Sequence, residues 1–107
     1  MAFRVKFSEQ SSTDIDRIVG YISDELSSPK AAQRFFMGVS GKIELLRANP
    51  YLFPLYHDKR LSAKGYRFAV IGSYLLFYVI DAGNSAVNIV RIIYGRRNIP
   101  VIIEPEC

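Results

Sequence analysis

The chain has 107 residues, of which half are hydrophobic and 13% are aromatic. This composition excludes a disordered chain, the apolar runs are too short to span a bilayer, and the length suits one domain with one modest core. The net charge is +4, and residues 56–97 hold seven basic side chains against two acidic ones. A basic half of this kind indicates an acidic or polyanionic partner.

Cysteine and histidine are too scarce for several kinds of site. The single cysteine, Cys107, excludes a disulfide framework, and with the single histidine, His57, it excludes a histidine- or thiolate-based metal cluster. The first ten residues, MAFRVKFSEQ, lack the apolar stretch of a secretory signal. We therefore expect a cytoplasmic protein with no metal and no cofactor.

The first half of the chain predicts one strand and then two helices. Residues 3–7 (FRVKF) alternate apolar and basic side chains, as a half-buried strand does. Hydroxyl residues suited to a helix cap follow, and apolar residues then recur at helical spacing within residues 15–26. The SSP at 27–29 separates this helix from a second one, with Ser28 as the cap and the proline in the first turn. The apolar side of the second helix comprises Ala32, Phe35, Phe36, Val39, Ile43 and Leu46.

The second half predicts a meander of three antiparallel strands. The segments YRFAV, YLLFYVI and AVNIVRIIY are rich in β-branched and aromatic residues. Gly72 and Ser73 suit a two-residue hairpin turn, and residues 81–85 supply a longer one. The expected fold is therefore α+β, with the order β-α-α-β-β-β and a helical hairpin packed on an antiparallel sheet. We assign residues 1–107 to this single domain.

Both faces of the predicted sheet are apolar. In the middle strand, alternating residues point to opposite faces of the sheet. One face has Leu75, Phe77 and Val79, and the other has Tyr74, Leu76, Tyr78 and Ile80. In the last strand, Val90 and Ile92 are predicted on the face opposite to Val87, Ile89 and Ile93. Two helices cover one face, so the other is covered either by a partner or by the connector 51–65 and the tail 99–107. The sequence leaves both alternatives open.

Arginine, lysine and tyrosine are the remaining candidates for a functional site. The candidates are Lys59, Arg60, Lys64, Arg67, Arg91, Tyr94, Arg96 and Arg97. Such a set would bind phosphates and stabilise charge at a scissile phosphodiester, with Tyr94 as the obvious proton-transfer group. The first and third strands of a meander run in the same direction, so Arg67 at the start of one need not lie near Tyr94 at the end of the other.

The alternative for these arginines is structural. Arg91 lies among buried residues, where an ion pair with a core carboxylate such as Asp81 or Asp16 would offset its desolvation. Arg96 and Arg97 would then be solvated surface residues.

Four segments, in this order, resemble the RelE/ParE superfamily of toxins from type II toxin–antitoxin systems. They are YISDELSSPKAAQRFF, NPYLFP, GYRFAV…YLLFYVID and VNIVRIIYGRRN, and the resemblance covers roughly residues 3–98. It implies a compact α+β toxin that inhibits growth. It also implies a cognate antitoxin that joins the toxin in a hetero-oligomer and covers its apolar surface and basic site residues.

The resemblance implies one of two targets. RelE-like members cleave mRNA on the ribosome, and Arg67 in GYR and Arg97 in GRR match two of their active-site arginines, while Lys59 or Lys64 stands for their lysines. In that case Arg67, Arg97 and Tyr94 would be catalytic. ParE-like members inhibit DNA gyrase and lack the nuclease set, so the basic residues Lys59, Arg60, Lys64, Arg91 and Arg96 would contact the target.

The proton-transfer group separates the two targets. The C-terminal tyrosine of RelE has no counterpart, because Ile103 stands at the corresponding place and Tyr94 is not equivalent to it. This difference favours a gyrase inhibitor, with a ribosome-dependent mRNA endoribonuclease as the alternative. A basic nucleic-acid-binding module without an antitoxin is a third hypothesis, which predicts salt-sensitive binding and no toxicity.

Overall fold

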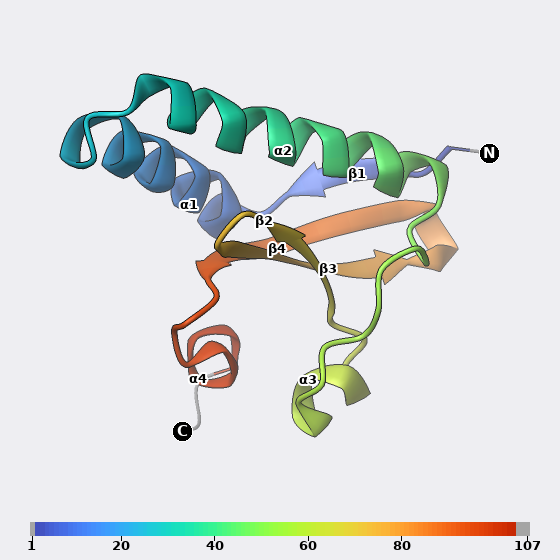
Figure 1. Ribbon diagram of the computed structural model, residues 1–107. Helices are drawn as coiled ribbons and strands as arrows, with labels where there is room; N and C mark the ends of the chain where they lie inside the picture. Colours follow the sequence, from blue (N-terminus) through green and yellow to red (C-terminus); the bar gives the residue numbers. More distant parts are fainter. Residues whose placement is uncertain (1, 105–107) are drawn as a thin grey trace.

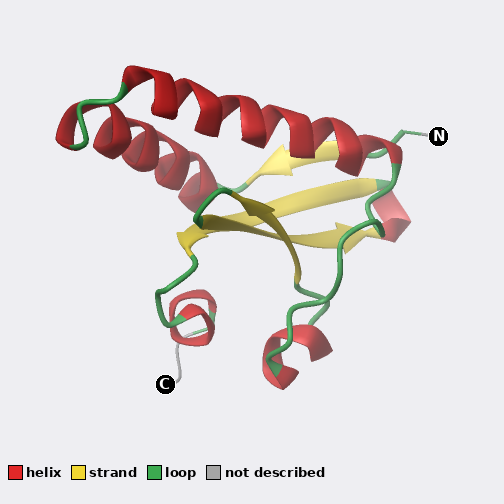
Figure 2. Cartoon of the chain, in the orientation of Figure 1, coloured by secondary structure: helices red, strands yellow, loops and turns green. Residues whose placement is uncertain are grey.

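In the computed structural model, which describes residues 2–104, a helical hairpin lies across one face of a four-stranded sheet (Figures 1 and 2). The elements are β1 (Arg4–Phe7), α1 (Glu9–Gly20), η1 (Tyr21–Glu25), α2 (Pro29–Ala48), α3 (Lys59–Ala63), β2 (Arg67–Ile71), β3 (Tyr74–Asp81), η2 (Ala82–Asn84), β4 (Ala86–Tyr94) and α4 (Ile99–Ile103). This confirms the predicted α+β class and adds two short helices, α3 and α4. Cys107 lies outside the described residues. None of the helices within residues 2–104 is long and apolar enough to cross a membrane.

The sheet is mixed, with the strand order β1-β4-β3-β2. The meander is antiparallel as predicted, but β1 pairs with β4 in parallel, so the sheet is not wholly antiparallel. The parallel pair arises because the helical hairpin carries the chain back across the sheet between β1 and the meander, as parallel strands require. The predicted turn between β2 and β3 is confirmed, with Gly72 at a φ of +58°.

Two serines begin the two long helices. Ser28 caps α2 as predicted, accepting a hydrogen bond from the Ala31 amide at 3.3 Å. Ser8 caps α1, accepting from the Ser11 amide at 3.0 Å, and its hydroxyl donates to the Val90 carbonyl of β4 at 2.8 Å. Ser8 therefore supplies an acceptor to the start of α1 and a donor to a β4 carbonyl that lies just beyond the end of β1.

We expect Ser8→Ala to lower the free energy of unfolding by about 0.5–2 kcal/mol, the range for loss of a helix cap. The Val90 carbonyl would lose its donor in the same variant. Urea denaturation measures the change, and Ser12→Ala is the control, because Ser12 is exposed on the same helix. Equal stability of the two variants would contradict the role of Ser8.

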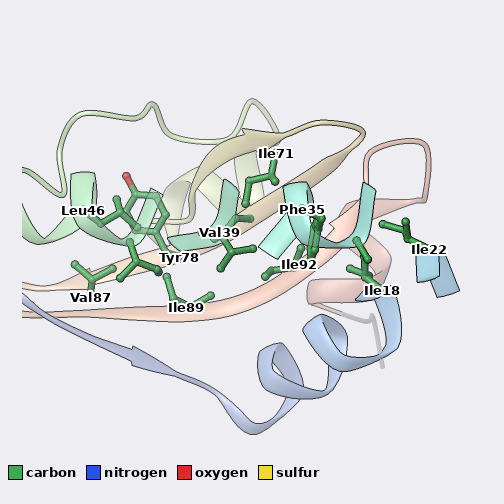
Figure 3. Packing of buried hydrophobic residues seen from close by; sticks show 13 residues of the cluster. Ile18, Ile22, Phe35, Val39, Leu46, Ile71, Tyr78, Val87, Ile89 and Ile92 are labelled. Atoms are coloured by element: carbon green, nitrogen blue, oxygen red, sulfur yellow. The ribbon is translucent and has the colours of Figure 1, made fainter. Parts of the chain in front are cut away.

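The main core lies between the hairpin and the sheet. Figure 3 shows side chains from α1, α2 and the sheet meeting there, including Phe35, Leu46 and Tyr78. The predicted buried side of α2 is confirmed except for Phe36, which is 55% exposed. That prediction was wrong because Phe36 lies about 100° around the helix from Phe35, outside the buried stripe.

A β-bulge in β4 changes the predicted alternation. Phe77 pairs with Arg91 and Tyr78 with Ile89, which leaves Val90 as an extra residue. Because a bulge shifts the phase of a strand, Ile92 packs in the same cluster as Ile89, and Ile93 packs on the other face. The assignment of the residues after the bulge was therefore wrong, whereas the two faces of β3 are as predicted.

The second face of the sheet is covered by the chain itself. A separate cluster joins the connector, the sheet and the tail, and its buried members are Tyr56, Leu61, Phe77, Ile93 and Ile99. In Figure 1, α3 and α4 both lie on the side of the sheet away from the hairpin. Of the two alternatives left open by the sequence, coverage by the connector and the tail is correct. Binding of a partner to this face stays a prediction, while the connector and the tail already cover it where the cluster lies.

Candidate binding groove and its basic residues

The predicted site residues lie in three separate places. Lys59, Arg60 and Lys64 belong to α3 and its C-terminal end, on the second face of the sheet. Arg67 begins β2, and Tyr94 ends β4, with Arg96 and Arg97 just beyond. Arg67 pairs with Tyr78 of β3, whereas Tyr94 pairs with Tyr74, so the two lie at opposite ends of the meander.

Arg60 and Lys64 hold the tail against the second core. Arg60 donates to the Pro100 carbonyl at 2.8 Å, and Lys64 lies 3.1 Å from the Glu104 carboxylate. The Tyr66 hydroxyl also donates to Glu104. Lys64 is the main cause of the lowered pKa of Glu104, which keeps this carboxylate ionised. These two basic residues thus have structural partners in the free chain, while Lys59 is exposed.

Arg67 is held at the connector end of the sheet. Its guanidinium donates to the Phe53 carbonyl at 2.7 Å and lies 5.3 Å from the centre of the Tyr51 ring. The neighbouring phenol, Tyr78, is buried and donates to the Pro50 carbonyl at 2.7 Å. Burial raises the pKa of Tyr78, so its proton is retained at neutral pH.

Arg91 forms a buried ion pair, although not with the predicted carboxylates Asp81 or Asp16. Its Nε and Nη2 atoms donate to Asp14 of α1 at 2.8 and 3.0 Å, and the Asp14 side chain is 2% exposed. These hydrogen bonds raise the pKa of Arg91. Asp14 also accepts from the Ile92 amide at 2.9 Å and from Arg17 at 2.8 Å. Strand β1 ends before this part of β4, so the carboxylate replaces a strand partner.

This ion pair borders a groove of about 1100 Å³, because Asp14 and Arg91 both line it. Its walls are the second half of α1, η1 and α2 as far as Lys42 on one side, and the β2–β3 turn and the end of β4 on the other. In Figure 1 the helical hairpin extends past the end of β4. Arg91, Tyr94 and Arg97 line this groove, so it contains three of the predicted site residues.

The groove also contains cations that are absent from the predicted site. Arg34 and Lys42 of α2 line it, as does Arg17 of α1. The spacing of Arg34, Gly38 and Lys42 is i, i+4 and i+8, which places them in one row beside the buried stripe of α2. This row is visible in the sequence, but the predicted site included only basic residues of the second half of the chain.

Three tyrosines lie at the same groove. Tyr74 packs edge-on against Phe35 at 5.2 Å and against Tyr94 at 5.8 Å, measured between ring centres. Tyr21 of η1 lines the groove with them. Burial, with smaller contributions from Tyr21 and Tyr94, raises the pKa of Tyr74. The Tyr74 phenol therefore offers a hydrogen-bond donor rather than a base.

The fold and the basic groove define a small α+β protein with a cationic hollow beside its helical hairpin. The family described as ParE toxin of type II toxin–antitoxin system, parDE, matches residues 5–99. The chain therefore belongs to this family, and it is the toxin of a type II toxin–antitoxin system. No curated protein matches the chain in sequence.

Solved structures with the same fold include both toxin types. The ParDE system of P. aeruginosa superposes with a TM-score of 0.67 at 15% identity, covering 87% of this chain and 96% of that one. The toxin–antitoxin complex RelBE2 of Mycobacterium tuberculosis gives 0.60 at 19% identity, with 88% and 99% covered. The archaeal RelE–RelB complex of Pyrococcus horikoshii OT3 gives 0.59 at 17%, with 91% and 99% covered. At these identities the similarity shows the fold alone.

Proposed function

We propose that this toxin inhibits bacterial growth by binding DNA gyrase in the cytoplasm and that a cognate antitoxin neutralises it by binding the toxin directly. The family match supports the gyrase target through the resemblance to ParE-like toxins. The antitoxin is supported by the three similar structures, which belong to toxin–antitoxin systems or complexes.

The distance between Arg67 and Tyr94 is the observation that favours gyrase over mRNA cleavage as the mode of action. From the strand register, the two residues lie roughly 13 Å apart along the strands and about 10 Å across them. Arg67 is further held by the Phe53 carbonyl and the Tyr51 ring. A phosphate contacted by Arg67 would thus lie out of hydrogen-bond reach of Tyr94, whereas general acid–base catalysis needs such reach.

The tyrosine beside Arg67 does not replace Tyr94 in this role. Tyr78 is fully buried, its hydroxyl donates to the Pro50 carbonyl, and its pKa is raised by burial. A buried phenol with a raised pKa is a poor general base at neutral pH. Inhibition of gyrase requires no proton transfer by the toxin, so this arrangement suits it.

The proposal is tested by brief expression of the chain in bacteria, with mRNA 5′ ends on ribosomes and plasmid supercoiling followed in the same cultures. We expect plasmids to lose negative supercoils while mRNA stays intact. Arg67→Ala and Arg97→Ala should each alter growth inhibition only as contact residues, at about 1.5–3 kcal/mol per charged hydrogen bond. mRNA cuts in phase with codons, in cells whose gyrase is unaffected, would instead establish the ribonuclease.

A further inference from the structure

The helix α2, which runs along the outside of the molecule (Figure 1), has an apolar row on the side opposite its buried stripe. Met37, Gly41 and Leu45 follow one another at intervals of four residues, so they lie in one row along the helix. Met37 is 64% exposed, Leu45 is 44% exposed, and Gly41 is exposed between them. The solvent side of a surface helix normally carries polar and charged residues. We call this row the outer face of α2, and its exposed apolar side chains indicate contact with another molecule.

Within residues 2–104, no packing contact requires a glycine at position 41. A Cβ atom added at Gly41 would meet nothing within 4 Å beyond its own helix backbone, whereas one added at Gly38 would lie 2.9 Å from the Ile71 side chain. The packing of α2 on β2 therefore explains Gly38 but not Gly41. A glycine inside a helix is destabilising relative to alanine, and what it allows is the close approach of another backbone. Gly41 thus indicates that a second segment packs directly on the outer face.

The outer face is symmetric about Gly41. Met37 and Leu45 lie four residues, or about 6 Å, to either side of it. When two copies of α2 pack antiparallel with Gly41 at a twofold axis, Met37 of each copy lies level with Leu45 of the other. A twofold contact uses the same patch on both copies, so it needs a self-complementary surface of this kind. An unrelated partner would not need this symmetry.

The charges beside the outer face also favour an antiparallel pair. Lys30 and Arg34 lie beside it in the first half of α2 by helical spacing. Glu44 lies beside it in the second half, where its ion pair with Arg47 is long, at 3.5 Å, and exposed. In the antiparallel pair, the two cations of one copy lie toward Glu44 and the negative C-terminal end of the other helix. A parallel pair would bring the cations together instead.

From these observations we propose that two copies of this chain associate through the outer face of α2, antiparallel and with Gly41 at the twofold axis. The contact is confined to one helix, so its area is at the small end of specific interfaces, which are weak and transient. The net charge of +4 on each copy also opposes association. We therefore expect a dissociation constant on the order of 10 µM. The proposal goes beyond the proposed function and does not rest on it.

The test uses the whole chain without any partner, made by cell-free synthesis, and measures the dissociation constant of the dimer by sedimentation equilibrium. We expect Met37→Glu/Leu45→Glu to raise this constant at least about tenfold, because it places four carboxylates in the contact. The control is Leu55→Glu/Val101→Glu, which makes the same change in net charge on the connector and on α4. Leu55 and Val101 are 44% and 52% exposed, so this variant should change the constant less than about threefold.

A substitution of Gly41 separates dimer contact from fold stability. Gln favours the helix more than Gly does, and a side chain at position 41 meets open space within the chain. We therefore expect Gly41→Gln to raise the melting temperature of the monomer while it weakens the dimer at least about tenfold. A merely structural glycine would not give these opposite signs.

A disulfide cross-link tests the geometry of the pair in a Cys107→Ser background, which removes the single native cysteine. With helix axes about 8–10 Å apart, facing Cα atoms lie about 3–5 Å apart, which overlaps the roughly 4.4–6.8 Å that a disulfide spans. With diamide as the oxidant, we expect Gly41→Cys to form a covalent dimer on a non-reducing gel. Ser40→Cys is the control and should form at least about tenfold less, because Ser40 lies about 100° around the helix.

Two results would overturn the proposal. One is a chain that stays monomeric at ten times the expected dissociation constant. The other is a dimer that Met37→Glu/Leu45→Glu and Gly41→Gln leave unchanged, because another surface would then form it. If the unmodified chain is monomeric and the outer-face variants lose binding to the antitoxin or to duplex DNA, the face belongs to that partner instead. Circular dichroism confirms that each variant is folded, and the assay of the chain alone gives the same result whether or not gyrase is the target.

Discussion

Replacing Asp14 with alanine is expected to lower the free energy of unfolding by about 3–5 kcal/mol, the cost of removing one partner from a buried ion pair. The carboxylate holds three groups: the Arg91 guanidinium, the Ile92 amide and the Arg17 guanidinium. Without it, Arg91, whose side chain is 18% exposed, would keep its charge among apolar residues. The Ile92 amide would lose its hydrogen-bond acceptor as well.

Urea denaturation of three further variants identifies the cause of this loss. Asp14→Asn keeps an acceptor for the Ile92 amide, so it should cost less than Asp14→Ala. Asp14→Leu/Arg91→Met removes both charges, and we expect it to recover to within about 2 kcal/mol of the unmodified chain. Asp16→Ala is the control, since Asp16 is exposed on the same helix and should change stability by less than about 0.5 kcal/mol. A loss in Asp14→Ala no larger than in this control would contradict the assigned role of the ion pair.

Replacing Ile99 with alanine is expected to cost about 2–5 kcal/mol, the range for truncating a buried isoleucine. Ile99 is 2% exposed and packs in the second core with Phe77 and Ile93. Because the tail is the outer layer of this core, the truncation should also loosen α4 and expose the amides of β3 and β4 to hydrogen exchange.

The matched control for Ile99→Ala is Val101→Ala on the same short helix. Val101 is 52% exposed, so its truncation should change stability by less than about 0.5 kcal/mol. Equal, small effects of the two substitutions in chemical denaturation would show that α4 does not stabilise the sheet. The partner expected on that face would then regain support.

The sequence predicted those parts of the fold that depend on local pattern. Ser28 and the following proline begin α2 because cap chemistry is local, and Gly72 forms the hairpin turn because it adopts a positive φ. The two faces of β3 follow from simple alternation. The resemblance, carried by ordered segments rather than single motifs, identified the family.

The remaining features depend on contacts between distant segments. The extra residue Val90 in β4 reverses the alternation of side chains. The apolar sequence of this strand does not indicate where the register shifts. Asp14 lies 77 positions from its partner Arg91, so the sequence around either residue does not identify the other as its partner. The coverage of the second face by α3 and α4 likewise depends on how the connector and the tail return to the sheet.

The candidate site, like the fold, could be predicted from the sequence only in part. The sequence identified the basic residues of the second half but treated them as one set, whereas the fold distributes them among the tail contact, the connector end and the groove. Arg34 and Lys42 complete the groove from a helix that we interpreted only by its buried stripe. Charge along the chain predicted an acidic partner, and only the three-dimensional arrangement indicated which cations face one another.

Gyrase as the target is tested most directly by a supercoiling assay with purified gyrase, relaxed plasmid and increasing amounts of the purified chain. The proposed function predicts that supercoiling falls as the chain is added and that prior addition of the antitoxin restores it in proportion to the toxin bound. Full supercoiling at every concentration of a folded chain that still arrests growth in cells would contradict gyrase as the target.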